Sequence, residues 1–215
     1  MLSPYKHITY DSYIYRHGIR WAINTSHNRM KNVRGLRTRN VERGIDAQMY
    51  MTKKYKNVLQ VRFESHSDRY SLDSNDEWRK TRDNFVERVE NKYGECKLLW
   101  GREFADGEKP HYHMVAWFNG HNIASAKPLQ AIWEDIHHKR DHSVPYDWSC
   151  SKYDQGVMHY GLPSQTTDRA FGWSYLCKVS TKGACTSGYD FDCSRLPKAK
   201  AEVIELNRGG STHAV

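Results

Sequence analysis

Two histidines and a glutamate between residues 103 and 113 have the types and the spacing of a metal site. His111 and His113 stand two positions apart in a segment rich in aromatic and branched residues, which predicts a β-strand. Side chains alternate between the two faces of a strand, so both imidazoles point the same way, about 7 Å apart. Glu103 lies on the preceding predicted strand, near the same end, and adds a carboxylate if it shares that face. This arrangement predicts a two-histidine, one-carboxylate site for a divalent metal.

The elements that must position these three residues are two strands joined by a short loop. Residues 97 to 104 and 111 to 119 have strand composition, and the ADGEKP segment between them carries Asp, Gly and Pro, which are typical of a hairpin loop. A His-x-His pair alone is more often two half-exposed histidines than a metal site. The facing glutamate, the proline before the second strand and a candidate nucleophile further along the chain favour the metal site.

Tyr175 is this candidate nucleophile. Residues 167 to 180 predict a helix, on which Tyr175, Lys178, Val179 and Lys182 are spaced i, i+3, i+4 and i+7 and share one face. A tyrosine on an amphipathic helix is usually part of the core, but burying this one beside two lysines would strand two charges. We therefore expect an exposed Tyr175 flanked by cations, where it can meet a phosphate group.

The remaining elements predict an α+β fold with a central antiparallel sheet. Strands are expected at residues 57 to 64 and 156 to 160, and further helices at 74 to 93 and 128 to 140. The order strand, helix, hairpin, helix, strand, helix fits an antiparallel sheet with helices packed on one face, which is a ferredoxin-like layout. Residues beyond Gly183 have the composition of a loop, and the final residues, NRGGSTHAV, have that of a frayed tail.

The positive charge of the chain is concentrated at its N-terminal end. Residues 1 to 56 contain 12 Lys and Arg against 3 Asp and Glu, whereas the rest of the chain is nearly neutral. This excess predicts a basic arm that contacts a polyanion, with nucleic acid as the first candidate and a solvated basic surface as the alternative. Aromatic residues interleaved with arginines, as in YIYRHGIRW, suit single-stranded DNA. The candidate phosphate contacts are Arg34, Arg37, Arg39 and Arg43.

Three motifs together resemble those of the HUH endonucleases. PHYHMVAWFNG resembles their His-hydrophobic-His motif, GREF resembles the strand that carries their third ligand, and YLCKVSTK resembles their Tyr-x-x-Lys motif. The resemblance covers about residues 57 to 185 and is nearest to the replication initiators of filamentous phages. It implies three parts: a basic arm at 1 to 56, an HUH endonuclease domain at 57 to 185, and a tail at 186 to 215.

The resemblance implies a rolling-circle nicking enzyme. His111, His113 and Glu103 would hold Mn²⁺ or Mg²⁺, and Tyr175, assisted by Lys178, would attack a DNA phosphate to leave a 5′-phosphotyrosine and a free 3′-OH. The implied partners are single-stranded DNA or an origin hairpin, together with a host helicase and polymerase in the bacterial cytoplasm. Relatives with two tyrosines have the second one at the position of Val179, so a second strand transfer needs another route.

Two other functions remain open from the sequence. One is a DNA-binding regulator on the same scaffold that does not cleave, and the other is a metal-dependent phosphodiesterase that uses water. ATP hydrolysis is not expected, because the chain has no GxxxxGK[ST] loop. No apolar run approaches 18 residues and the five cysteines lack CxxC spacing, so we expect a cytoplasmic protein without a membrane segment, a disulfide framework or a zinc ribbon.

Overall fold

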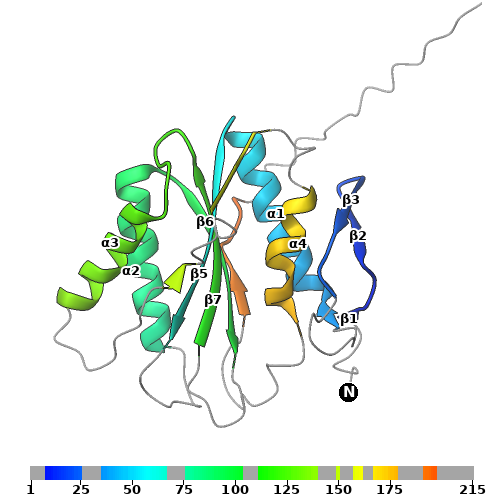
Figure 1. The fold of residues 1–215 in the computed structure, drawn as a ribbon, viewed down its shortest axis with the longest axis horizontal. Coiled ribbons are helices and arrows are strands. Elements are labelled where there is room, and N and C mark those ends of the chain that lie inside the picture. Colours follow the sequence, from blue (N-terminus) through cyan, green and yellow to red (C-terminus); the bar gives the residue numbers. More distant parts are fainter. Residues whose placement is uncertain are drawn as a thin grey trace, which may run out of the picture.

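An antiparallel β-sheet forms the centre of the computed structural model (Figure 1). The structure describes residues 8–25, 35–66, 76–103, 111–139, 149–150, 157–161, 167–178 and 191–197, and every statement below concerns these residues. The strands of the sheet are β5 (Val58–His66), β6 (Cys96–Glu103), β7 (His111–Asn119), β8 (Ser149–Cys150), β9 (Val157–Tyr160) and β10 (Phe191–Cys193). Their order is β10-β6-β7-β5, and β8 and β9 both pair with the outer edge of β5.

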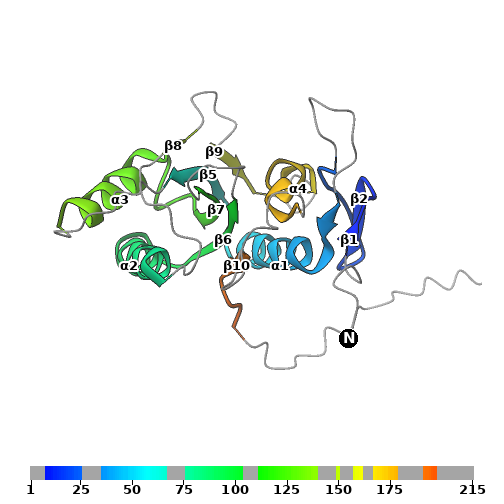
Figure 2. The same ribbon diagram turned by 90° about the horizontal axis from the view of Figure 1, so that it is seen from below.

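Helices cover both faces of this sheet (Figure 2). One face carries α1 (Thr38–Lys54) and α4 (Thr167–Ser174), and the other carries α2 (Asp76–Tyr93) and α3 (Lys127–Lys139). The α+β class is confirmed, but the expectation of helices on one face only is wrong. The physical reason lies in the two central strands, whose side chains are buried on both faces along nearly their whole length. None of the helices described here is long and apolar enough to cross a membrane.

Alternating side chains of β7 belong to two separate hydrophobic cores. Met114, Ala116 and Phe118 pack with α2 and α3, whereas Val115 and Trp117 pack with α1 and α4. This division follows from the two-residue period of a strand. His111 and His113 have the same parity as Val115 and Trp117, so the sheet directs both imidazoles toward the α1 and α4 side.

The chain before residue 57 contributes to this second core. It forms β1 (Ile8–Thr9), paired with β4 (Leu36–Arg37), a hairpin of β2 (Tyr13–Arg16) and β3 (Ile19–Ala22), and then α1. On α1, Val41 and Ile45 are fully buried against the sheet. Helix α1 is therefore part of the packed domain rather than of an arm beside it.

The predicted tail also supplies a strand. Phe191–Cys193 forms β10 and pairs with β6, with Phe191 opposite Gly101. The Arg43 guanidinium of α1 donates hydrogen bonds to Asp192 Oδ1 and to the Cys193 carbonyl oxygen, each 2.8 Å long. The segment is only three residues long, which is too short for a periodic pattern to reveal. The expectation of a loop at these residues is wrong.

Candidate metal centre

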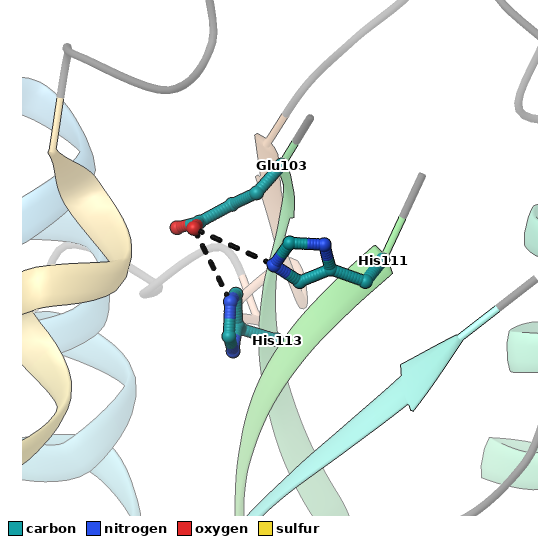
Figure 3. A group of neighbouring side chains, drawn as sticks. All are labelled: Glu103, His111 and His113. Atoms are coloured by element: carbon teal, nitrogen blue, oxygen red, sulfur yellow. Dashed lines mark ion pairs between the residues drawn. The ribbon is translucent and has the colours of Figure 1, made fainter. Parts of the chain in front are cut away.

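Glu103, His111 and His113 converge at one end of the sheet, as predicted (Figure 3). In the antiparallel pairing of β6 with β7, Glu103 lies directly opposite His111, and His113 lies opposite Gly101. Residues directly opposite each other on neighbouring strands share a face of the sheet. The short hairpin therefore brings the carboxylate and both imidazoles to the same side.

The ligand atoms of the three residues all lie within 4.8 Å of one another. Glu103 Oε2 lies 3.2 Å from His113 Nε2 and 3.7 Å from His111 Nε2. The two imidazole rings are nearly perpendicular, with centroids 4.8 Å apart. Glu103 and His113 are buried, and His111 is partly buried, so the cluster sits at the edge of the core rather than on an open surface.

These residues fit a divalent cation. The second carboxylate oxygen, Glu103 Oε1, is buried and has no hydrogen-bond partner among the described residues. A buried carboxylate oxygen normally has a partner, and a bound cation would supply one. Two imidazole nitrogens and a carboxylate are suitable ligands for several divalent metals, so the donor set supports a metal without selecting Mn²⁺ or Mg²⁺.

Glu64 is a fourth member of the cluster that sequence reasoning missed. It lies on β5 directly opposite His113 on β7, and its Oε1 is 2.9 Å from His113 Nδ1. This contact orients the ring so that Nε2 faces Glu103, an arrangement that second carboxylates often provide at metal sites. The hydrogen bond with His113 lowers the pKa of Glu64 although burial opposes this shift.

The cluster holds two carboxylates in the charged form. Burial by itself raises the pKa of Glu103, but the hydrogen bond from His113 and the positive charges of His113 and Lys178 outweigh it and lower that pKa to about 2. For His113 burial by itself lowers the pKa, but the contacts of the imidazole with Glu103 and Glu64 outweigh burial and raise that pKa. The two carboxylates therefore place negative charge beside His113, and a cation bound by Glu103 and His113 would take the place of the imidazole proton.

Tyr175 and Lys178 reach the cluster by a geometry that differs from the predicted one. The helix α4 ends at Ser174, Tyr175–Cys177 forms a 3₁₀ turn, and Lys178 is extended and bridges Leu36 of β4. The expected helical face is therefore wrong at Lys178. The chain leaves the helix because it pairs with β4, and the Lys178 ammonium then lies 2.8 Å from Glu103 Oε2.

Neither side chain is exposed as we expected. Lys178 is 8% exposed, and its ion pair with Glu103 removes the cost of burying an unpaired charge. The Tyr175 hydroxyl oxygen lies 3.3 Å from His113 Nδ1, and the Arg62 guanidinium lies over the phenol ring at 4.8 Å. Burial is the main cause that raises the pKa of Tyr175, Arg62 opposes it, and the charges of the two glutamates raise it further.

The other candidate residues have different positions. Arg37 and Arg39 lie at the start of α1, next to Leu36, which bridges Lys178, and Arg39 is exposed. Arg43 is held by Asp192 and the Cys193 carbonyl. Arg34, Val179 and Lys182 lie outside the described residues.

Among the alternative nucleophiles, only Tyr160 can be placed, because Tyr153 and Tyr189 also lie outside the described residues. Tyr160 is 3% exposed, and its hydroxyl donates to Gln60 Oε1 at 3.4 Å. Tyr160 pairs with Val58 at the start of β5, whereas His111 and His113 of β7 pair with the far end of that strand. Tyr160 is therefore separated from the cluster by most of the length of β5.

A cavity of about 430 Å³ lies elsewhere, between α2 and the β6–β10 edge of the sheet. Its lining includes Arg82, Trp100 and Asp192 but none of the residues of the metal-site cluster. The chemistry described above is therefore located at the end of the sheet and not in this cavity.

The fold and the site define an α+β domain with a candidate metal centre next to a tyrosine and a lysine. Comparison of the chain with protein-family models, curated proteins and solved structures found no match in any of the three. The resemblance to HUH endonucleases therefore depends on the three sequence motifs and stays a prediction.

Proposed function

We propose that the protein is an HUH-type endonuclease that nicks single-stranded DNA with Tyr175 as its nucleophile and so initiates rolling-circle replication. The observation that carries this proposal is the position of the Tyr175 hydroxyl, 3.3 Å from Nδ1 of His113, whose Nε2 faces the Glu103 carboxylate. A tyrosine hydroxyl beside a candidate metal ligand is placed for metal-assisted attack on a phosphate.

The residues of the site divide the reaction between them. A divalent cation held by Glu103, His111 and His113 would polarise the scissile phosphate and stabilise the charge that builds on it. The Tyr175 oxygen forms a bond to phosphorus while the bond to the 3′ oxygen breaks. The hydroxyl proton of Tyr175 passes to Glu64, which hydrogen-bonds it, and the departing 3′ oxygen takes a proton from water to become a free 3′-OH.

Positive charges around the phenol support this step. The Arg62 guanidinium and the Lys178 ammonium lie 4.8 Å and 5.3 Å from the centre of the Tyr175 ring, where they favour the phenolate. The phosphodiester energy is kept in the 5′-phosphotyrosine bond, so a later attack by a 3′-OH can rejoin the strand. The helicase and the polymerase that would act on the nicked strand remain predictions.

The test is covalent attachment to DNA. The wild-type protein, incubated with Mn²⁺ and a pool of single-stranded oligonucleotides, is expected to form an adduct that survives denaturation. Tyr175→Phe removes one oxygen and keeps the ring, so it should abolish the adduct and leave Mn²⁺ binding, measured by calorimetry, unchanged within about threefold. Tyr160→Phe is the matched control and should form the adduct normally, because Tyr160 lies away from the cluster. An adduct in Tyr175→Phe would overturn the assignment.

A hydrolytic phosphodiesterase is the second candidate, and one observation favours it. Burial raises the pKa of Tyr175, which keeps the phenol protonated and suits a hydrogen-bond donor better than a nucleophile. In that case water would attack the phosphate and no adduct would form. Cleavage in ¹⁸O-labelled water distinguishes the two, because only hydrolysis transfers the label directly to the product phosphate.

A further inference from the structure

The hairpin of β2 and β3 presents two tyrosines and an arginine on its outer side. In its register Tyr15 lies opposite Arg20, and Tyr13 lies opposite Ala22, so these four residues share one face. Tyr13 is 39% exposed and Tyr15 is 66% exposed, which is unusual for large aromatic side chains in one small patch. The two rings meet edge to face with centroids 5.6 Å apart, and the Arg20 guanidinium lies 4.3 Å from the centre of the Tyr13 ring.

The inner side of the hairpin is firmly packed. Trp21 is fully buried, and its indole N–H donates to the Arg16 carbonyl oxygen at 3.1 Å. Arg16 makes two hydrogen bonds to Asp46 of α1, at 2.9 Å and 2.7 Å, and His17 Nε2 lies 2.7 Å from the same carboxylate. The exposed rings are therefore carried by a hairpin that is anchored to the domain core.

The turn of the hairpin is equally well defined. His17 and Gly18 both have positive φ values, 53° and 71°, as in the two-residue turns that match the twist of paired strands. A rigid support matters for binding because little conformational freedom is then lost when a ligand is ordered on it.

The chemistry of this face suits a chain of stacked bases linked by phosphates. An exposed aromatic ring can stack on any nucleobase, and a neighbouring guanidinium can pair with a phosphate. The outer face carries the cation Arg20 and no carboxylate among its four residues, and residues 1 to 56 contain 12 Lys and Arg against 3 Asp and Glu. The charge therefore complements a polyanion.

The hairpin also lies beside the segment that carries Tyr175. Figure 1 shows β3 next to α4, with which it is in contact, and the backbone N–H of Asn24, just beyond β3, donates to Ser174 Oγ at 2.8 Å. Ser174 is the residue immediately before Tyr175. The end of β3 therefore lies close to the residue that precedes the candidate nucleophile.

We infer that the outer face of the β2–β3 hairpin binds single-stranded DNA on one side of the cleavage point, with bases stacked on Tyr13 and Tyr15 and a phosphate on Arg20. The inference rests on the proposed function only for the identity of the strand and for the reaction at Tyr175. Duplex DNA is not the expected ligand, because its bases are already stacked on one another and do not offer their faces to a side chain.

Binding without cleavage tests this inference separately from the reaction. Fluorescence anisotropy with a labelled 15-nucleotide deoxythymidine strand in EDTA measures affinity while metal-dependent cleavage is prevented. The double variant Tyr13→Ala and Tyr15→Ala should raise Kd at least about tenfold, since stacking on each ring is lost. The matched variant Tyr13→Phe and Tyr15→Phe keeps both rings and should bind within about twofold of the wild type. Arg20→Gln should reduce the slope of log Kd against log salt by about 0.7, the value for one phosphate contact on a single strand.

The outcomes separate the two proposals. A Kd unchanged in the alanine variant, or equal losses in the alanine and phenylalanine variants, would overturn the hairpin as the stacking surface, whatever the adduct assay shows. Tighter binding of a matched duplex than of the single strand would overturn it too. Hairpin-dependent binding in a protein that never forms a covalent adduct would support the binding surface while the proposed transesterification fails.

Discussion

The two faces of the central sheet use the same strands for different purposes. On the α2 and α3 side, Trp78, Phe85 and Trp133 pack with Phe63 and Tyr112 in a continuous aromatic core. On the α1 and α4 side, the apolar core gives way at one end to Glu64, Glu103, His111, His113, Tyr175 and Lys178, which contact one another through charges and hydrogen bonds.

The contrast is sharpest within three consecutive residues of β7. Tyr112 points to the aromatic side, where its ring stacks on Trp78 with centroids 4.0 Å apart and an angle of 11° between the planes. His111 and His113, on either side of it in the chain, point to the polar cluster. A strand alternates its side chains, so the aromatic core on one face holds the backbone that positions the ligands on the other. This comparison predicts that the two faces can be damaged separately.

Loss of a candidate ligand should have the largest effect. His113→Ala removes the imidazole between Glu103 and Glu64, and we expect it to abolish nicking. It should also lower Mn²⁺ affinity more than about 100-fold, because loss of a ligand should exceed the 10–100-fold typical of changes to residues around the ligands. His111→Ala should also abolish nicking, and Glu103→Ala should weaken metal binding. Calorimetry with Mn²⁺ and a nicking assay measure both effects.

His159→Ala is the matched control for this prediction. His159 is exposed on β9, and its Nε2 lies 3.1 Å from the Ala124 carbonyl oxygen, away from the cluster. The His159→Ala variant should bind Mn²⁺ and nick DNA as the wild type does. After chelation, Mn²⁺ or Mg²⁺ should restore the activity of the wild-type protein. Wild-type nicking that continues in excess EDTA would contradict a metal site at Glu103, His111 and His113.

Damage to the aromatic face should instead appear as lost stability. Trp133 is 1% exposed and contacts Phe63, Trp78 and Phe85, so Trp133→Ala should lower the free energy of unfolding by about 3–5 kcal/mol. Urea denaturation followed by circular dichroism measures this change. Where the variant is still folded, its Mn²⁺ affinity should be within about threefold of the wild type. A larger loss of affinity in the folded variant would show that the two faces do not act separately.

The sequence predicted the parts of the site that depend on local geometry. His111 and His113 share a face because a strand has a two-residue period, and Glu103 joins them because a short hairpin fixes which residues face each other. Glu64 was missed because its position opposite His113 depends on the pairing of β5 with β7, about fifty residues apart in the chain. The alternation of Gln60 and Arg62 along β5 was the available signal, since the next residue with that parity is Glu64.

Other predictions failed where tertiary contacts decided the outcome. Lys178 was expected on a continuing helix, but pairing of the chain with β4 ends the helical conformation and turns its ammonium toward Glu103. The observed helices α2 and α3 and strands β5, β6 and β7 lie within about two residues of their predicted bounds, because each is long and strongly patterned. The four-residue strand β9 also matches its predicted position. That helices cover the second face of the sheet could be predicted only from the fact that α1 folds back onto it.

Glu64 offers a finer test of how the polar face is held together. Glu64→Gln keeps the size and a hydrogen-bond acceptor but removes the charge beside His113, so Mn²⁺ affinity should fall by about 10–100-fold. Glu87→Gln, on the exposed side of α2, removes one negative charge elsewhere and should leave the affinity unchanged. Equal affinities for Glu64→Gln and the wild type would mean that Glu64 does not orient His113 for metal binding.

The smallest expected effect concerns which face meets DNA. Arg39 is exposed at the start of α1, near the bridge between Leu36 and Lys178, whereas Arg79 is exposed on α2. Arg39→Gln should weaken binding of a labelled single strand at every sequence and reduce its salt slope by about 0.7, because one phosphate contact is lost. Arg79→Gln should change neither. Arg43→Gln should also lower thermal stability, since Arg43 ties α1 to Asp192.

The same anisotropy titrations, repeated at several salt concentrations in EDTA, decide between the faces. Equal salt slopes for the wild type and Arg39→Gln would return the start of α1 to an ordinary solvated surface. A reduced slope in Arg79→Gln alone would move the DNA to the α2 side, because counterion release reports only the cations that meet phosphates. The polar cluster would then lie on the opposite face of the sheet from its proposed substrate, and the proposal that Tyr175 attacks that substrate would fail with it.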